Sequence, residues 1–259
     1  MTYAIVRNYE LEITGRFAAD RNPPRPEYKR ERLAELGLNT SKVIHEIANH
    51  LNGISTSVQV VKYQMTQQED CDRTLKTIDD LVCQLKNLQD LLQELRDFGR
   101  PLKLNCEPLS LAALAGEVIS QALPAMATQS VESKQNFPDS LPPVLADQKK
   151  LKQVLINLVK NATEAMPKGG LLTLRGYEEA GHICIETQDT GIGIPEDVRV
   201  FDPFATSKPE GMGLGLPIAR DIITAHHGTI EYVSELGNGT TFKISLPAAT
   251  ITSGAAVVP

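Results

Sequence analysis

The sequence predicts an α+β protein in which a long helical hairpin precedes an α/β sandwich. Residues 27–68 contain no proline and only two glycines, and their apolar or small side chains recur in steps of three and four. After Pro101 the pattern changes to short strand and helix segments separated by glycine-rich loops. We therefore expect a lead-in over residues 1–26, the hairpin over 27–100, the sandwich over 101–247 and a flexible tail over 248–259.

The hairpin is predicted from two apolar stripes. A polar break at residues 67–70 admits a turn, and a second stripe over residues 75–95 ends at Gly99, Arg100 and Pro101. The first stripe consists of Leu36, Thr40, Val43, Ile47, Leu51, Ile54, Val58, Val61 and Met65. A hairpin alone buries such stripes poorly, whereas two hairpins can bury them in a four-helix bundle. We therefore expect a homodimer.

The sandwich is predicted from alternating helix and strand signals. Helices are expected over residues 109–122, 148–166 and 217–225. Strands are expected over residues 171–177, 182–188, 229–234 and 240–245. In the lead-in, residues 3–13 have the pattern of one or two short strands, followed by a proline-rich linker.

Charge and composition exclude several classes of function. The net charge is −6 and no long basic run occurs, so nucleic acid is not expected as a direct partner. No apolar stretch approaches the roughly 20 residues that span a bilayer, so no membrane segment is expected. The four cysteines form no CxxC pair, which is typical of a reduced, cytoplasmic protein.

The segment LINLVKNATEAM has two asparagines four residues apart. Asn157 and Asn161 would lie on one helix face, where their amide oxygens could coordinate a magnesium ion that also binds phosphates. Lys160 lies beside them and could reach a phosphate. Polar residues on a helix that simply face water are the alternative interpretation.

A carboxylate follows the second predicted strand, in the segment QDTGIGIP. Asp189 could accept a hydrogen bond from the exocyclic amine of adenine, while Gly191 and Gly193 allow close approach. An ordinary Asp-Thr-Gly turn is the alternative.

Two further segments suggest phosphate binding. FDPFATSK, residues 201–208, could form a movable lid with Lys208 near the terminal phosphate, or a surface loop pinned by two buried phenylalanines. A glycine-rich segment then opens a helix, where backbone N–H groups favour anions. Its candidate residues are Gly211, Gly213, Leu214 and Gly215.

The order NxxKN, DxGxG, FxPF…K and GxGLG, followed by a final hairpin that contains Thr240, resembles one known domain. It is the ATP-binding domain, or Bergerat fold, shared by histidine kinases, type II topoisomerases, mismatch-repair ATPases and a heat-shock chaperone. The resemblance covers about residues 105–247. It implies ATP and Mg²⁺ as cofactors, with Asn157 and Asn161 as metal ligands and Thr240 among the nucleotide-binding residues.

ATPases of this superfamily generally have a glutamate where this chain has Asn157, so transfer to a protein acceptor is favoured over hydrolysis. His45 on the first long helix is the candidate acceptor, because it lies about 160° from the apolar stripe and a neutral imidazole accepts phosphoryl groups. Glu46 could orient the ring or accept its proton, and Asn49 follows one turn later. A solvated histidine without chemistry is the alternative.

The segment ERLAELG followed by HEIxNxL resembles the dimerisation and phosphoacceptor domain of sensor histidine kinases of the nitrogen-regulation type. This resemblance implies autophosphorylation of His45 and transfer to an aspartate of a response-regulator receiver domain. It also implies phosphatase activity, in which Glu46 takes part and the residue at the Asn49 position holds a water. His50 stands where the family commonly has proline, so we expect a straighter helix and a packing role for His50.

Two other functions remain open at this point. One is a related kinase of the same superfamily that phosphorylates serine. The other is a nucleotide-binding pseudokinase that signals only through the conformation of its dimer.

Overall fold

The computed structural model describes residues 40–66, 71–99, 102–206, 212–248, 250–252 and 255–257. The lead-in strands predicted over residues 3–13 and the turn predicted at 67–70 lie outside the described residues. Two compact units are formed. One comprises the described parts of Arg25–Pro101 together with Asp202–Gly215, and the other comprises those of Leu102–Phe201 and Leu216–Pro259. The described residues 202–206 and 212–215 group with the hairpin, and the predicted domain boundary at residue 101 stays a prediction.

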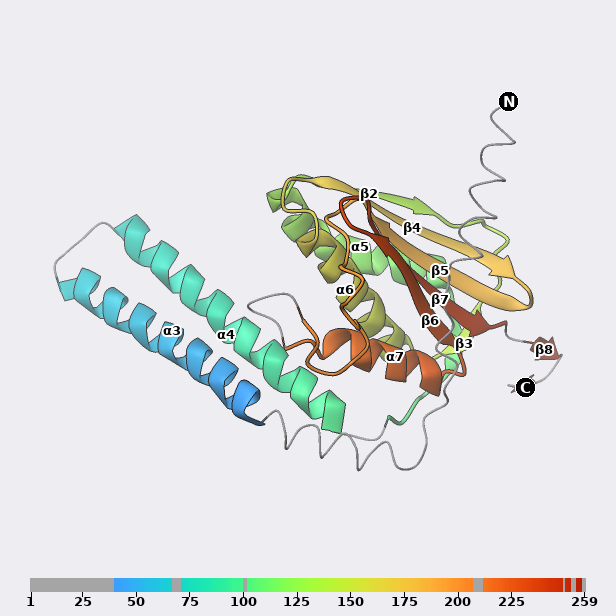
Figure 1. Cartoon of the computed structure of the whole chain (residues 1–259), viewed down its shortest axis with the longest axis horizontal. Coiled ribbons are helices and arrows are strands. Elements are labelled where there is room, and N and C mark those ends of the chain that lie inside the picture. The colour runs from blue at the N-terminus through green and yellow to red at the C-terminus, as the bar shows by residue number, and fades with distance from the viewer. Residues whose placement is uncertain are drawn as a thin grey trace. The chain divides into compact units, whose positions relative to one another are not determined.

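The hairpin consists of two long helices, α3 (Thr40–Thr66) and α4 (Cys71–Gly99), which pack along each other (Figure 1). The two predicted helices are confirmed over these residues, but the apolar side chains of α3 form two rows and not one stripe. One row is half-buried within the hairpin and consists of Val43, Ile47, Ile54 and Val61. The other row recurs every seven residues and is exposed; it consists of Ile44, Leu51, Val58 and Met65, with exposed fractions of 61%, 52%, 51% and 70%.

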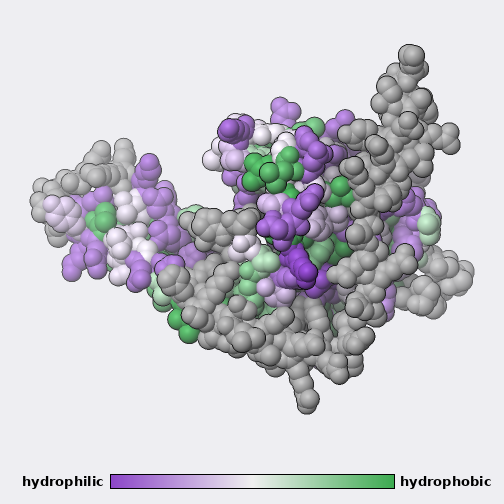
Figure 2. Space-filling view, viewed as in Figure 1, coloured by the Kyte–Doolittle hydropathy of each residue, from purple (hydrophilic) through white to green (hydrophobic). Residues whose placement is uncertain are grey.

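Helix α4 likewise has apolar residues that are exposed. Its exposed apolar residues are Leu75, Ile78, Val82, Leu85 and Leu92. On the side in view, the hairpin surface mixes hydrophobic with hydrophilic residues (Figure 2). Apolar residues spaced by seven on both helices form the seam that a coiled coil or helical bundle buries.

The second unit is built on a five-stranded sheet of order β2-β4-β5-β7-β6. Its strands are β2 (Val131–Asn136), β4 (Gly170–Glu179), β5 (His182–Asp189), β6 (Thr229–Glu235) and β7 (Gly239–Pro247). Only β2 is parallel to its neighbour, and the other pairs are antiparallel. The four predicted strands are confirmed, each slightly longer than expected.

Several strands were not predicted. Besides β2, these are β1 (Glu107–Leu109) and β3 (Val144–Ala146), which pair antiparallel. The tail, expected to be flexible, contains β8 (Thr250–Thr252) and β9 (Ala255–Val257), which also pair antiparallel.

The helices α5 (Leu111–Thr128), α6 (Gln148–Glu164) and α7 (Gly215–Ala225) belong with this sheet. Helix α5 packs on α6 and β2, and α6 packs on β5 (Figure 1). The prediction that α5 ends near residue 122 is wrong, because the helix continues through Pro124. By length and composition α5 is the one described helix apolar enough to cross a membrane, and 33% of it is buried here.

The core lies between these helices and one face of the sheet. It contains Leu151, Leu155, Leu158, Leu172, Leu174, Ile183, Ile185 and Ile244, each at most 1% exposed. Side chains alternate between the two faces of a strand, so Leu172 and Leu174 face this core while Arg175 and Tyr177 face the other side.

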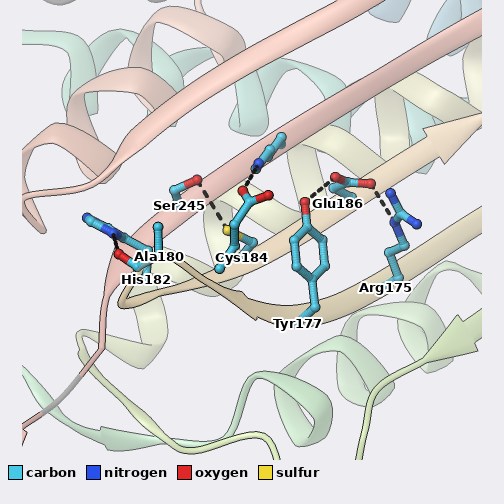
Figure 3. A network of polar contacts seen from close by, with 9 residues as sticks. Arg175, Tyr177, Ala180, His182, Cys184, Glu186 and Ser245 are labelled. Atoms are coloured by element: carbon cyan, nitrogen blue, oxygen red, sulfur yellow. Dashed lines mark hydrogen bonds and ion pairs between the residues drawn. The ribbon is translucent and has the colours of Figure 1, made fainter. Parts of the chain in front are cut away.

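That other face carries a polar network (Figure 3). The carboxylate of Glu186 accepts hydrogen bonds from Arg175 Nε (2.6 Å) and from the Tyr177 hydroxyl (2.5 Å). Burial and the neighbouring Glu186 raise the pKa of Tyr177, so the phenol stays protonated and donates. Lys243 of β7 forms an ion pair with Glu179 of β4 on the same face of the sheet. Both oxygens of the buried Glu186 are thus satisfied, and the network cross-links β4, β5 and β7.

Candidate functional site

Asp189, the last residue of β5, is buried and joins two segments far apart in the sequence. Its Oδ1 accepts hydrogen bonds from the backbone N–H of Gly191 (2.9 Å) and of Thr240 (3.2 Å). Burial raises the pKa of this carboxyl, although both hydrogen bonds oppose the shift. Within the described part of the chain both hydrogen bonds go to Oδ1, so Oδ2 can accept from a ligand.

The glycines after Asp189 allow its loop to pack on backbone. A Cβ atom on Gly191 would lie 2.5 Å from the carbonyl oxygen of Ala165, at the end of α6. Gly193 has a φ of +71°, and a Cβ there would lie 2.2 Å from the carbonyl oxygen of Glu235. The sequence analysis did not predict that these two glycines pack against backbone carbonyl oxygens of other segments. Close approach of a ligand to these glycines stays a prediction.

Ser234, at the end of β6, holds the same loop and was missed by sequence reasoning. Its Oγ accepts a hydrogen bond from the backbone N–H of Ile194 (2.8 Å) and donates to the carbonyl oxygen of Gly239 (3.1 Å). The Thr240 hydroxyl lies 2.9 Å from it. The predicted residue Thr240 is therefore buried in a network that fixes the β6–β7 turn against the Asp189 loop.

Asn157 and Asn161 lie on one face of α6, as their spacing predicted. Asn161 Nδ2 donates a hydrogen bond to Asn157 Oδ1 (3.4 Å). Asn157 Nδ2 is buried and has no hydrogen-bond partner among the described residues. Leaving a buried amide donor unsatisfied costs about 1–3 kcal/mol. Such an atom indicates a position where a ligand atom can accept.

The two flanking charged residues on α6 lie at the surface. The side chain of Lys160 is 60% exposed, and its Nζ is 4.0 Å from Glu164 Oε1. This arrangement fits a solvent-facing Glu164. Contact between Lys160 and a phosphate stays a prediction.

The amide oxygens of Asn157 and Asn161 suit a hard cation. Across the described ranges, no group of three or more His, Cys, Asp or Glu side chains could hold a metal ion. Mg²⁺ commonly takes one or two protein oxygens and completes its six ligands with water and substrate phosphates. The residues present therefore fit Mg²⁺ only when it arrives with a nucleotide.

The segment 202–206 meets the start of the glycine-rich segment within the other unit. Phe204 has a φ of +64°, and its N–H donates to the carbonyl oxygen of Gly213 (3.2 Å). Its ring is buried and packs edge-on against Phe98 at 6.0 Å. Phe204 thus pins this loop, as the alternative interpretation proposed, whereas Phe201 is only half-buried.

The glycine-rich segment opens a helix as predicted. Gly215 is the first residue of α7, and Leu214 before it is fully buried. Gly213 has a φ of +67°, and a Cβ there would lie 2.5 Å from the carbonyl oxygen of Ala205. Lys208 and Gly211 lie outside the described residues.

The predicted acceptor region lies in α3. The helix runs without interruption through His45, Glu46, Asn49 and His50. Asn49 is exposed and His50 is half-buried. The side chains of His45 and Glu46 lie outside the described residues, so their orientation stays a prediction.

Comparison with known proteins identifies this arrangement. The family model described as "Histidine kinase-, DNA gyrase B-, and HSP90-like ATPase" matches residues 146–250. The solved catalytic domain of the histidine kinase ThkA is 30% identical, and the match covers 97% of that domain and 57% of this chain with a TM-score of 0.50. This chain belongs to the histidine kinase family. The matched residues form the family's ATP-binding domain, which confirms the predicted Bergerat fold.

Other histidine kinases match both units. ThkA in complex with the response regulator protein TrrA is 28% identical with a TM-score of 0.69, over 85% of this chain and 64% of that one. The histidine-protein kinase AtoS of Escherichia coli is 34% identical over 84% of this chain and 36% of its own length. Sporulation kinase C of Bacillus subtilis is 31% identical over 79% of this chain and 47% of its own length. The chain thus spans between a third and a half of the length of these curated relatives.

A second family model, described as "Brefeldin A-sensitivity protein 4-like domain", matches residues 15–181. This range ends between β4 and β5 and would divide the five-stranded sheet. It corresponds to neither compact unit and adds no interpretation of the site.

Proposed function

We propose that this chain is the cytoplasmic catalytic core of a sensor histidine kinase, which binds ATP with Mg²⁺ and transfers the γ-phosphoryl group to its own His45. The observation that carries the proposal is the Asp189 carboxylate, whose hydrogen bonds within the described residues, from Gly191 and Thr240, both go to Oδ1. A buried carboxylate at a strand end with one oxygen left to accept suits the exocyclic amine of adenine.

The phosphates would lie near the asparagines of α6. Asn157 and Asn161 would hold Mg²⁺ through their amide oxygens, and the unsatisfied Asn157 Nδ2 would gain a phosphate or water acceptor. Lys160, Lys208 and the backbone N–H groups of residues 211–215 would neutralise the phosphate charge. When bound, Mg²⁺ neutralises charge on the phosphates during transfer.

Transfer itself requires a nucleophile and little covalent help from the protein. A neutral ring nitrogen of His45 would form the new bond to the γ-phosphorus, the bond from that phosphorus to the bridging oxygen would break, and ADP would leave. Glu46 would accept the proton that the imidazole loses. Autophosphorylation could then run within one hairpin or across a dimer.

We propose that the hairpin forms a homodimer through its exposed apolar rows. These rows recur every seven residues on α3, and four of their members on the two helices are Leu51, Val58, Val82 and Leu85, between 47% and 59% exposed. Two such hairpins would bury the rows in one four-helix bundle.

A response-regulator receiver domain is the proposed partner. In the related structure ThkA is bound to the response regulator protein TrrA. In this chain His45 would pass its phosphoryl group to an aspartate of such a domain. Glu46 and the exposed Asn49 would support the reverse reaction, removal of phosphate from the regulator by an attacking water.

Incubation with γ-labelled ATP and Mg²⁺ tests this function. The wild type should gain label that is lost in acid and stable in base, as expected of a phosphoimidazole, and His45→Gln should gain none. Acid-stable label would indicate serine or threonine phosphorylation. An unlabelled wild type that still binds nucleotide would indicate a pseudokinase.

A further inference from the structure

His226, directly after α7, is a buried histidine that the phosphotransfer chemistry does not use. Its Nε2 accepts a hydrogen bond from the backbone N–H of Asp147 (2.9 Å), across 79 residues of sequence. Since Nε2 accepts, the proton of the neutral ring must be on Nδ1, which then donates to the carbonyl oxygen of Ile222 (2.7 Å). Both ring nitrogens are therefore satisfied in a single tautomer.

Asp147 is the other end of this connection and the N-cap of α6. Its Oδ1 accepts from the backbone N–H of Lys150 (3.1 Å), and its Oδ2 accepts from the backbone N–H of Asn105 (2.9 Å). Burial alone would raise the pKa of Asp147, but hydrogen bonds from backbone N–H groups outweigh burial and lower it. The residue therefore stays a charged cap and also holds the segment that enters this unit before β1.

The two helices joined in this way carry different parts of the proposed nucleotide site. Helix α6 carries Asn157 and Asn161, and α7 begins at Gly215, where the glycine-rich segment ends. Because an α-helix is stiff, fixing the end of α7 against the start of α6 limits how the first turn of α7 can move relative to the asparagines.

We propose that His226 is a positioning residue for the nucleotide site, and that its hydrogen bond with Asp147 keeps α7 aligned with α6. This inference rests on the proposed binding of ATP. Protonated His226 would have no acceptor for the Asp147 N–H, so the alignment requires the neutral ring.

The surroundings of His226 shift its pKa in opposite directions. Burial, the largest cause, and the neighbouring His227 lower the pKa of His226, whereas the hydrogen bond to Ile222 and the charge of Asp147 raise it. Beyond Asp147 lies the Cys106 thiol, whose own pKa is raised by burial and by the Asp147 charge. Because the net shift of the pKa is downward, His226 stays neutral at neutral pH and protonates at a lower pH than an ordinary histidine.

Nucleotide affinity separates a positioning role from a purely structural one. The full chain would be titrated with a non-hydrolysable ATP analogue and Mg²⁺. Each variant would be measured at a temperature that lies a fixed number of degrees below its own Tm. His226→Asn keeps the donor toward Ile222 but cannot reach Asp147, and should bind about tenfold more weakly. His226→Gln can reach Asp147 with its amide oxygen and should restore most of the affinity. His227→Asn, the same change at the exposed neighbour, should bind like the wild type.

Equal affinity of His226→Asn and wild type would overturn the inference, and so would equal losses in His226→Asn and His226→Gln. If His226→Asn does not fold, the pH profile decides. Wild-type affinity should then fall more steeply than that of His226→Gln as the pH is lowered, and coincident profiles would reject the positioning role. A wild type that binds no nucleotide would instead reject the proposed function.

Discussion

The hairpin and the sheet-containing unit differ in how far they bury their apolar side chains. Leu155, Leu172 and Ile244 of the sheet-containing unit are 0% exposed. On the hairpin, Val82 is 59% exposed and Met65 is 70% exposed. The sheet-containing unit thus has a buried core of its own, whereas the hairpin presents apolar rows that a second chain can cover.

The same contrast applies to the residues proposed to act. Asp189 and Thr240 are buried in hydrogen-bond networks that hold them in one arrangement. Asn49 lies exposed on α3. A nucleotide site benefits from fixed groups, and an acceptor helix must remain open to a catalytic domain and to a partner.

The largest expected effect is in the core of the sheet-containing unit. Leu155→Ala should lower the free energy of unfolding by about 3 kcal/mol, because it leaves a cavity between α6 and the sheet. Leu123→Ala on α5, where the side chain is 51% exposed, should change it by no more than about 0.5 kcal/mol. Denaturant titration of the two variants measures both values, and similar losses would contradict the described core.

A charge on the hairpin should affect association instead. Val82→Asp would bring a carboxylate into the proposed bundle and should raise the Kd of the dimer at least about tenfold, with little change in the sheet-containing unit. Asn87→Asp adds the same charge at an exposed position on a different face of α4. Sedimentation equilibrium should show dissociation only for Val82→Asp. Equal association of both variants would mean that this row is not the interface.

A smaller effect is expected where backbone strain is stored. His227 has a φ of +58°, which glycine adopts without strain, so His227→Gly should raise the free energy of unfolding by about 1 kcal/mol. The same change at His182, the first residue of β5, should lower it by about 0.5–1 kcal/mol, because a strand disfavours glycine. Thermal unfolding should give shifts of opposite sign, and shifts of the same sign would contradict this explanation.

Periodicity was enough to predict the long helices, the four main strands and the common face of Asn157 and Asn161. It could not predict β2, because five of its six residues are exposed and its pattern therefore shows no alternation. Strands β1 and β3 contain three residues each, too few for a periodic pattern.

The partners of the site residues were also beyond prediction from sequence. Asp189 and Thr240 are 51 residues apart, and Ile194 and Ser234 are 40 apart, so their hydrogen bonds depend on the register of β5, β6 and β7. The packing of Gly191 and Gly193 on distant carbonyl oxygens has the same origin. The spacing of the motifs identified residues of one site, whereas their hydrogen-bond partners became known only from the fold.

The central claim is a division of labour in which the Asp189 site binds ATP and helix α3 accepts its phosphoryl group. Measuring nucleotide affinity and phosphate incorporation on the same preparations of His45→Gln and Asp189→Asn tests it most directly. His45→Gln should bind the nucleotide like the wild type and incorporate no phosphate. Asp189→Asn should bind about tenfold to a hundredfold more weakly, because it loses a charged acceptor, and should incorporate phosphate correspondingly slowly. Wild-type affinity in Asp189→Asn, or phosphate incorporation in His45→Gln, would contradict the account.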